Sequence, residues 1–180
     1  FAVLLRVLGS GFINISAHWV SLIGMMAALS MLIGNLVAVH QNNVKRLLAY
    51  SGIAQAGYIF VAVMAVGLAY LRPESATPQW GQTAIVLYLF LYTITNIGAF
   101  AITGIVARET GSDDMSAFAG LRTRAPLLAF AMTLLLLSLG GIPLLSGFVG
   151  KWFLFLSGVA EGQYLLVILG AATSVVSIYY

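Results

Sequence analysis

The sequence LSLGGIPLLSGFVGK at residues 137–151 interrupts an apolar stretch that runs from residue 125 to residue 160. An unbroken helix of these 36 residues would be about 54 Å long at the usual helical rise, whereas a hydrocarbon core is about 30 Å thick. Gly140 and Gly141 loosen a helix, and Pro143 removes a backbone donor and clashes with the preceding turn. The pattern therefore predicts one helix over 125–160 that is interrupted at Gly140–Pro143, as in transporters that bind ions at broken helices.

The composition predicts a membrane protein. Eight basic and five acidic residues make 13 charges in 180 residues (7%), while 61% of the residues are hydrophobic and the mean hydropathy is +1.03. A soluble domain has about 25% charged residues, and a disordered chain lacks this much apolar surface. We therefore expect an all-α, polytopic transmembrane helix bundle that forms a single membrane domain over residues 1–180.

Apolar segments of about 20 residues, the length that crosses a bilayer, recur along the chain. Besides the interrupted helix, the expected spans are the tail of a span at 1–8 and the segments 19–39, 44–71, 83–107 and 164–180. Because the first and last residues both lie within apolar runs, we interpret the chain as a fragment of a longer protein.

The basic residues indicate an orientation. With these spans, the turn at 40–46 and the loop at 108–124 lie on one side of the membrane and carry five of the eight basic residues, including Lys45 and Arg46. Short cytoplasmic loops are enriched in lysine and arginine. We therefore expect this side to face the cytoplasm.

The sequence lacks the residues that bind redox centres and nucleotides. It has no cysteine, two histidines and no glycine-rich or Walker phosphate-binding motif, so we expect no metal and no cofactor on this chain. The basic residues are scattered rather than clustered, so we also expect no nucleic-acid binding. Any redox chemistry would therefore take place on a partner.

Two lysines are the candidate functional residues. Lys151 follows the helix break, and an ionisable residue at membrane depth marks an ion or proton path by default. The alternative is that Lys151 begins an ordinary helix and extends to the lipid headgroups. Lys45 begins the 44–71 span beside Arg46, where a pair of basic residues can also be a plain cytoplasmic anchor.

Two polar stripes indicate a hydrated interior. The members of each stripe share one face of a helix: Ser51, Gln55 and Tyr58 on one span, and Tyr88, Tyr92 and Thr95 on the next. Polar side chains that faced lipid would be unsatisfied, so we expect both stripes to face the bundle or water. Hydrogen bonds between helices, without any role in transport, would explain them equally.

Several motifs together resemble one family. They are Gly34-Asn35-Leu36-Val37-Ala38, Val44-Lys45-Arg46-Leu47-Leu48-Ala49-Tyr50-Ser51, Gly57-Tyr58, Asn96-Ile97-Gly98-Ala99-Phe100 and the interrupted stretch at 137–151. Over essentially its whole length the chain resembles the antiporter-like membrane subunits of respiratory complex I, in both their bacterial form and their plastid and cyanobacterial form.

The resemblance implies a fold with two inverted repeats of helices, of which this chain would hold the end of the first and nearly all of the second. It implies that Lys151 is the proton-relay lysine of the family's broken helix, and that Lys45 and Tyr50 belong to its Lys-Arg-x-x-x-Tyr motif. Many members have histidine where this sequence has Gln55. The glutamate and two lysines of the family's first repeat have no counterpart in these 180 residues.

The function implied by the resemblance is proton translocation across a bacterial inner membrane, within the enzyme NADH–quinone oxidoreductase. Electron transfer from NADH to quinone, through FMN and iron–sulfur clusters, would take place on the other membrane and hydrophilic subunits of complex I. Two other classes stay open from the residues themselves. One is a subunit of a multi-subunit cation/proton antiporter, and the other is a purely structural membrane subunit.

Overall fold

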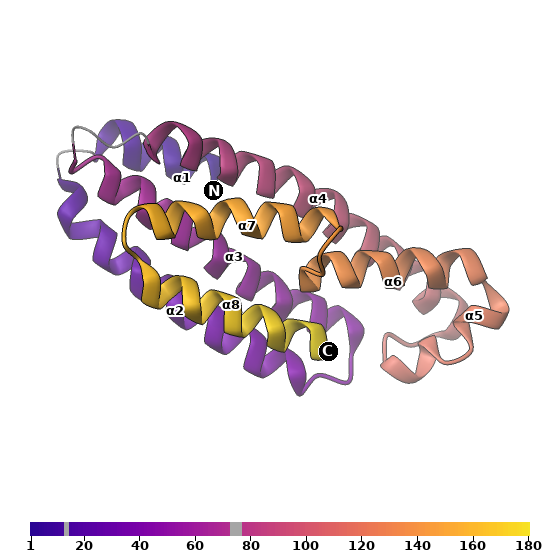
Figure 1. The fold of residues 1–180 in the computed structure, drawn as a ribbon. Coiled ribbons are helices and arrows are strands. Elements are labelled where there is room, and N and C mark those ends of the chain that lie inside the picture. The colour runs from indigo at the N-terminus through magenta and orange to yellow at the C-terminus, as the bar shows by residue number, and fades with distance from the viewer. Residues whose placement is uncertain (13–14, 73–76) are drawn as a thin grey trace.

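The computed structural model describes residues 1–12, 15–72 and 77–180, and every regular element in this part of the chain is helical. The predicted all-α fold class is thereby confirmed (Figure 1). In chain order the elements are α1 (Ala2–Arg6), η1 (Val7–Gly11), α2 (Ser16–Val39), α3 (Val44–Ala69), α4 (Thr77–Thr110), η3 (Met115–Phe118), α5 (Leu121–Arg124), α6 (Pro126–Gly140), α7 (Ser146–Ala160) and α8 (Tyr164–Tyr179).

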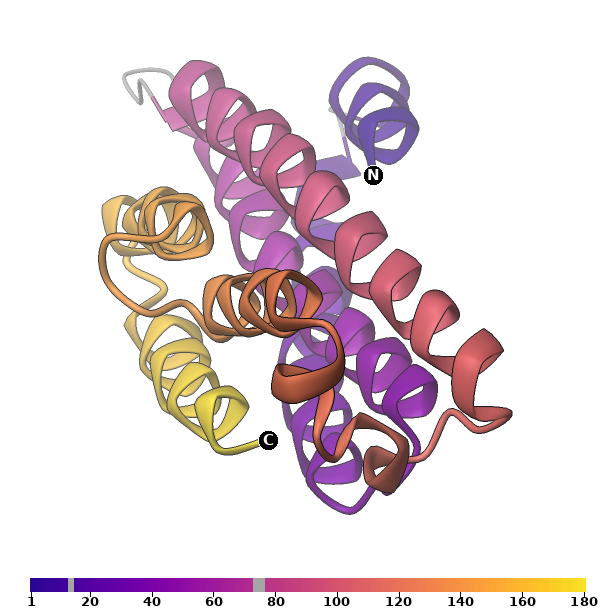
Figure 2. The same cartoon turned by 90° about the vertical axis from the view of Figure 1, so that its right-hand side faces the viewer.

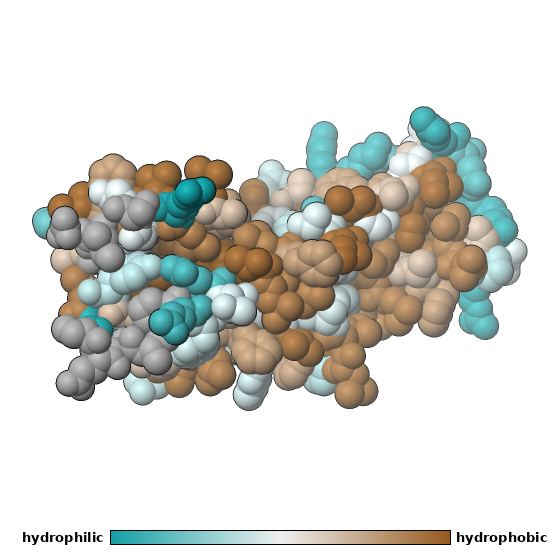
Figure 3. Space-filling model, turned by 90° about the horizontal axis from the view of Figure 1, so that it is seen from above, coloured by the Kyte–Doolittle hydropathy of each residue, from teal (hydrophilic) through white to brown (hydrophobic). Residues whose placement is uncertain are grey.

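Three helices are long and apolar enough to cross a membrane, namely the segments Ala17–Val39, Val44–Ala69 and Gln79–Thr110. Large hydrophobic side chains lie exposed along the outside of the bundle, as at Leu22 and Leu29 on α2. Figure 3 shows a broad hydrophobic band across one face of the molecule, with hydrophilic side chains gathered toward its ends. The chain is a multi-pass integral membrane protein.

Several helices extend beyond the apolar segments expected from hydropathy. α4 has 34 residues and includes polar ends on both sides of the 83–107 segment. Amides, hydroxyls and charged side chains do not stop a helix once it leaves the hydrocarbon core, so helix length exceeds span length there. For the same reason the loop expected at 108–124 contains the short helices η3 and α5.

α3 is the central helix of the bundle. It packs against α2, α4 and α7, and Figure 2 shows α6, α7 and α8 gathered on one side of α2, α3 and α4. Two glycines bring α2 and α3 close together. A Cβ added at Gly34 would lie 2.5 Å from the Ala54 amide nitrogen, and one added at Gly57 would lie 2.8 Å from the Met31 amide nitrogen.

The interruption of the 125–160 helix is confirmed. α6 ends at Gly140, and Gly141 adopts the left-handed conformation (φ 86°) that commonly ends helices. Two backbone amides then fold back: Gly141 donates to the Leu137 and Ser138 carbonyls, at 3.1 and 3.0 Å, and Ile142 donates to the Leu137 carbonyl at 3.1 Å.

The second half of the interrupted helix, α7, begins at Ser146. Ser138 on α6 holds this start in place. Its hydroxyl oxygen accepts a hydrogen bond from the Gly147 amide at 3.1 Å, which satisfies one of the free donors of the first turn of α7. The two half-helices are therefore joined by a side-chain bond across the break.

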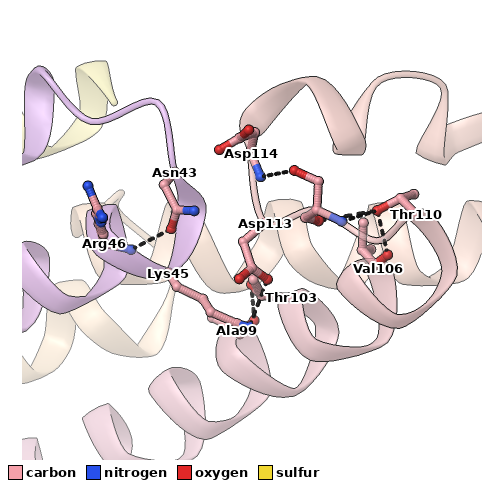
Figure 4. Close-up of polar contacts among 10 residues, drawn as sticks. Asn43, Lys45, Arg46, Ala99, Thr103, Val106, Thr110, Asp113 and Asp114 are labelled. Atoms are coloured by element: carbon pink, nitrogen blue, oxygen red, sulfur yellow. Dashed lines mark hydrogen bonds and ion pairs between the residues drawn. The ribbon is translucent and has the colours of Figure 1, made fainter.

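The α2–α3 turn and the α4–α5 loop meet at one end of the bundle (Figure 4). Asn43 and Asp114 form an antiparallel bridge, the Val44 amide donates to the Asp113 carbonyl at 2.9 Å, and Lys45 pairs with Asp113 at 2.7 Å. The two basic segments expected on one side of the membrane therefore lie together. Beyond the other end of α3, Arg72 pairs with the buried Glu161 at 3.3 Å.

Candidate functional site

The break between α6 and α7 creates a pair of carbonyl acceptors inside the bundle. A helix ends with four backbone carbonyls that have no partner within the helix. At the end of α6 the backbone satisfies those of Leu137 and Ser138, which leaves the carbonyls of Leu139 and Gly140. These two also lie at the negative end of the helix dipole, so the site attracts a cation or a strong donor.

Lys151 fills this position. Its side chain reaches from the first turns of α7 to the end of α6, and its Nζ donates to the Leu139 carbonyl at 2.9 Å and to the Gly140 carbonyl at 3.2 Å. The residue is 4% exposed, so its amine does not extend to the bilayer surface within this bundle. Gly141 makes room for it, because a Cβ there would lie 3.3 Å from Nζ.

Side chains from two other helices bind the same two carbonyls. Gln55 of α3 donates to the Leu139 carbonyl at 3.0 Å. The Ser177 hydroxyl of α8 donates to the Ser174 carbonyl of its own helix at 2.7 Å and has the Gly140 carbonyl as a second, longer acceptor at 3.3 Å. The Tyr88 hydroxyl of α4 in turn donates to the Gln55 side-chain oxygen. A continuous set of polar groups therefore connects α4, α3 and the amine of Lys151.

Tyr58 supplies an aromatic face to the amine. Lys151 Nζ lies 4.6 Å from the centre of the Tyr58 ring, within the range in which a cation is attracted to a ring face. Tyr58 is fully buried. Four residues that the sequence singled out, Lys151, Gln55, Tyr58 and Tyr88, thus lie in one cluster.

The remaining members of the two stripes lie outside this cluster. Tyr92 stacks on Tyr88 with ring centres 6.2 Å apart. Thr95 is buried but donates to the Leu91 carbonyl of its own helix at 2.6 Å, and Tyr50 is half-buried. Ser51 is buried and lines a cavity of about 240 Å³ that the Ser177 and Tyr180 side chains also line.

Lys45 lies apart from Lys151, at the first turn of α3. Its side chain is 46% exposed, and its partner is Asp113. The two candidate lysines therefore have different environments: Lys45 is paired with a carboxylate near the end of the bundle, whereas Lys151 is buried against carbonyls and a ring.

Three polar residues of this region had no role assigned from the sequence: Asn35, Ser177 and Tyr180. Asn35 belongs to one of the motifs quoted above, and an amide within an apolar span was the available signal. Ser177 and Tyr180 lie on or beside α8, whose contact with the break depends on tertiary packing. Among the described residues no cluster of three metal-ligating side chains occurs.

The chain matches the family described as NADH:quinone oxidoreductase/Mrp antiporter, transmembrane, over residues 1–177. NADH-quinone oxidoreductase subunit N of Desulforamulus reducens is 50% identical over all of this chain and 35% of its own length. The subunit N of Heliobacterium modesticaldum is 44% identical, over all of this chain and 36% of its length. The NAD(P)H-quinone oxidoreductase subunit 2 of Prochlorococcus marinus is 43% identical, over all of this chain and 32% of its length.

Solved structures show the same fold. A chain of respiratory complex I from Thermus thermophilus, with bound aureothin, is 34% identical, with a TM-score of 0.70 over 89% of this chain and 34% of that chain. A chain of the Mrp complex from Dietzia is 25% identical, with a TM-score of 0.81 over 99% of this chain and 31% of that chain.

The chain spans about a third of the length of these relatives. The family model nevertheless covers nearly every residue of it, and the resemblance drawn from the sequence motifs is confirmed. The chain belongs to the NADH:quinone oxidoreductase/Mrp antiporter transmembrane family.

Proposed function

We propose that this chain is a proton-translocating part of a membrane subunit of an NADH–quinone oxidoreductase. The names of the relatives at 43–50% identity support this assignment. In this proposal the chain lies in a bacterial inner membrane and assembles with the other membrane and hydrophilic subunits of the complex. Those subunits hold FMN and iron–sulfur clusters and pass electrons from NADH to quinone, while this chain carries protons.

Lys151 is the proposed proton relay, and its burial at the helix break is the observation that supports this role. A buried ammonium at membrane depth is costly and is rarely present without a function. Here the amine touches two carbonyls and lies beside a polar set that includes Gln55 and Tyr88. These groups can orient a proton donor or acceptor without holding a fixed countercharge beside it.

The cavity of about 240 Å³ supplies a route for protons to this relay. It is lined by Ser51, Ser177 and Tyr180 and by Gly140, whose carbonyl accepts from Lys151. A cavity of this size with several polar partners can hold a number of water molecules. The proposed path runs from the Ser51 level of α3 to the amine, with Tyr50, Tyr92 and Thr95 as supporting polar groups.

Lys45 is proposed as a second relay on the same path. It lies closer to the N-terminal end of α3 than the cavity does, because the cavity-lining residues Leu47, Leu48 and Ser51 come two, three and six residues later, which is within two turns of the helix. Its carboxylate partner Asp113, 2.7 Å away, holds the amine in position at this end of the path.

The test of Lys151 is its replacement by glutamine in the assembled complex. Removal of a positioned proton-transfer group slows the transfer by about 10²–10⁴-fold, so we expect fewer protons pumped per NADH oxidised in sealed vesicles. The exposed Arg108 gives a matched control, as Arg108→Gln. Wild-type pumping stoichiometry in the Lys151→Gln complex would contradict the role, and loss of assembly without loss of coupling would favour a purely structural subunit.

A cation/proton antiporter is the second candidate function. The likeness to the Mrp chain, at a TM-score of 0.81 over 99% of this chain, favours it, while the higher sequence identity to the oxidoreductase subunits favours the first candidate. Proton movement that requires NADH oxidation supports the first. Proton movement driven by a sodium gradient in the absence of NADH supports the second.

A further inference from the structure

Asn35 connects α2 to α3 and to Tyr180, the residue after α8, beside the Lys151 site. It lies within α2 and is 1% exposed. Its Nδ2 donates to the Met31 carbonyl at 2.8 Å and to the Tyr58 hydroxyl at 3.2 Å, and its Oδ1 accepts from the Tyr180 hydroxyl at 3.0 Å. Both ends of the amide are therefore engaged, by its own helix, by α3 and by the residue that follows α8.

These partners determine the direction of each hydrogen bond. The Met31 carbonyl can only accept, so the nitrogen of the amide must face it. The Tyr58 hydroxyl lies on this nitrogen side and accepts, whereas the Tyr180 hydroxyl lies on the oxygen side and donates. A rotated amide would place two acceptors against each other at Met31, so a single orientation of Asn35 is stable.

The Tyr58 ring is consequently held at two points. Its hydroxyl is bound by Asn35, and Phe155 of α7 meets it in an edge-to-face arrangement with ring centres 5.7 Å apart. The ring held in this way has Lys151 Nζ 4.6 Å from its centre. The contact between amine and ring therefore depends on an amide that itself does not touch the lysine.

We propose that Asn35 is a positioning residue of the proton relay, which holds the ring of Tyr58 against the amine of Lys151. The proposal rests on the proposed function of Lys151. Close packing of the backbones supports it, because Gly34 and Gly57, each next to one of the two bonded residues, remove the side chains that would separate α2 from α3. A shift of α2 away from α3 would break the Asn35–Tyr58 bond.

The pH dependence of pumping is a direct measure of the contact between the Lys151 amine and the Tyr58 ring, because few other ionisable groups surround the amine in the described structure. Tyr58 faces it from α3 and is the aromatic partner. Tyr88 of α4 is connected to it through the Gln55 amide, which donates to the same Leu139 carbonyl as the lysine. The ion pairs found among the described residues involve other side chains, Lys45 with Asp113 and Arg72 with Glu161. A cation is favoured by a ring face, so loss of the contact makes the charged amine less stable.

The experiment uses the full-length chain in the assembled complex, in sealed membrane vesicles. Protons pumped per NADH oxidised are measured over a series of pH values for Asn35→Leu, Tyr58→Phe and the double variant. Asn35→Leu is expected to move the pH at which pumping is half-maximal about half a unit to one unit lower. Tyr58→Phe keeps the ring but loses its anchor, so it is expected to move the profile in the same direction.

The double variant should shift the profile no further than the stronger single variant, because both changes break the same bond. Thr103→Val is the matched control: Thr103 is fully buried, and its hydroxyl donates to the Ala99 carbonyl of its own helix at 2.8 Å. The Thr103→Val complex should have the same pH profile of pumping as the wild type.

A wild-type pH profile for Asn35→Leu, or additive shifts in the double variant, would overturn the proposal. If Asn35→Leu fails to assemble, Tyr58→Phe decides alone, and an unchanged profile there overturns it equally. Failure of the proposed function is recognised separately. In that case Lys151→Gln itself pumps normally. Failure of this inference alone leaves Lys151→Gln with reduced pumping and Asn35→Leu with the wild-type pH profile.

Discussion

At the scale of single residues, the neutral side chain of Gln55 makes hydrogen bonds to two other helices at the site. Its amide donates to the Leu139 carbonyl at 3.0 Å and accepts from the Tyr88 hydroxyl, so it joins α4 to the helix break. Replacing it by leucine leaves a buried hydroxyl without its acceptor, and a buried unsatisfied group costs about 1–3 kcal/mol. We therefore expect Gln55→Leu to lower both the thermal midpoint of the purified complex and its pumping per NADH.

The control for Gln55 is Thr103→Val on α4. Thr103 is also buried, but its hydroxyl bonds only within its own helix in the described structure. A smaller effect on pumping is expected, because no connection between helices is lost. Equal losses in Gln55→Leu and Thr103→Val would show that the link to Tyr88 has no special part in proton transfer.

At the scale of elements, the α6–α7 break depends on a glycine that the sequence does not distinguish from its neighbours. A Cβ added at Gly147 would overlap the Ser138 carbonyl of α6. Gly147→Ala must therefore push the half-helices apart and weaken the Ser138 cap, and we expect a lower thermal midpoint and less assembled complex. Gly104→Ala in α4 is the control, since no atom outside its chain neighbours and the adjacent helix backbone lies within 4 Å of the added Cβ and alanine favours a helix by about 1 kcal/mol. Equal behaviour of the two variants would contradict the close approach at Gly147.

At the scale of the whole molecule, Lys45 lies where the α2–α3 turn meets the α4–α5 loop. It can serve there as a proton relay or as a tether between the two segments, and two variants distinguish these roles. The backbone bridge between Asn43 and Asp114 persists when the ion pair is lost, and a partly exposed pair is worth about 0–1 kcal/mol. Asp113→Asn should thus leave both assembly and most of the pumping intact, because the lysine proton is still present. Lys45→Met should lower pumping at unchanged assembly. If Lys45→Met pumps as well as Asp113→Asn, Lys45 serves only as a tether between the two segments.

The sequence predicted the parts of the molecule that depend on neighbouring residues. The break at Gly140–Pro143 follows from local backbone preferences, and the shared face of Ser51, Gln55 and Tyr58 follows from the helical period. The partners of these groups could not be predicted in the same way. The contact of Ser177 with the break, or of Asp113 with Lys45, depends on the rotation and offset of helices far apart in the chain, which no periodic pattern specifies.

The helix end that holds Lys151 has a consequence for the proposed proton relay. An ammonium has three N–H donors, and a neutral amine has two. The carbonyls of Leu139 and Gly140 accept two, so both remain satisfied whether or not the third proton is present. Both carbonyls at the break therefore keep a hydrogen bond whether the Lys151 amine is charged or neutral. A change in its protonation does not require either half-helix to refold.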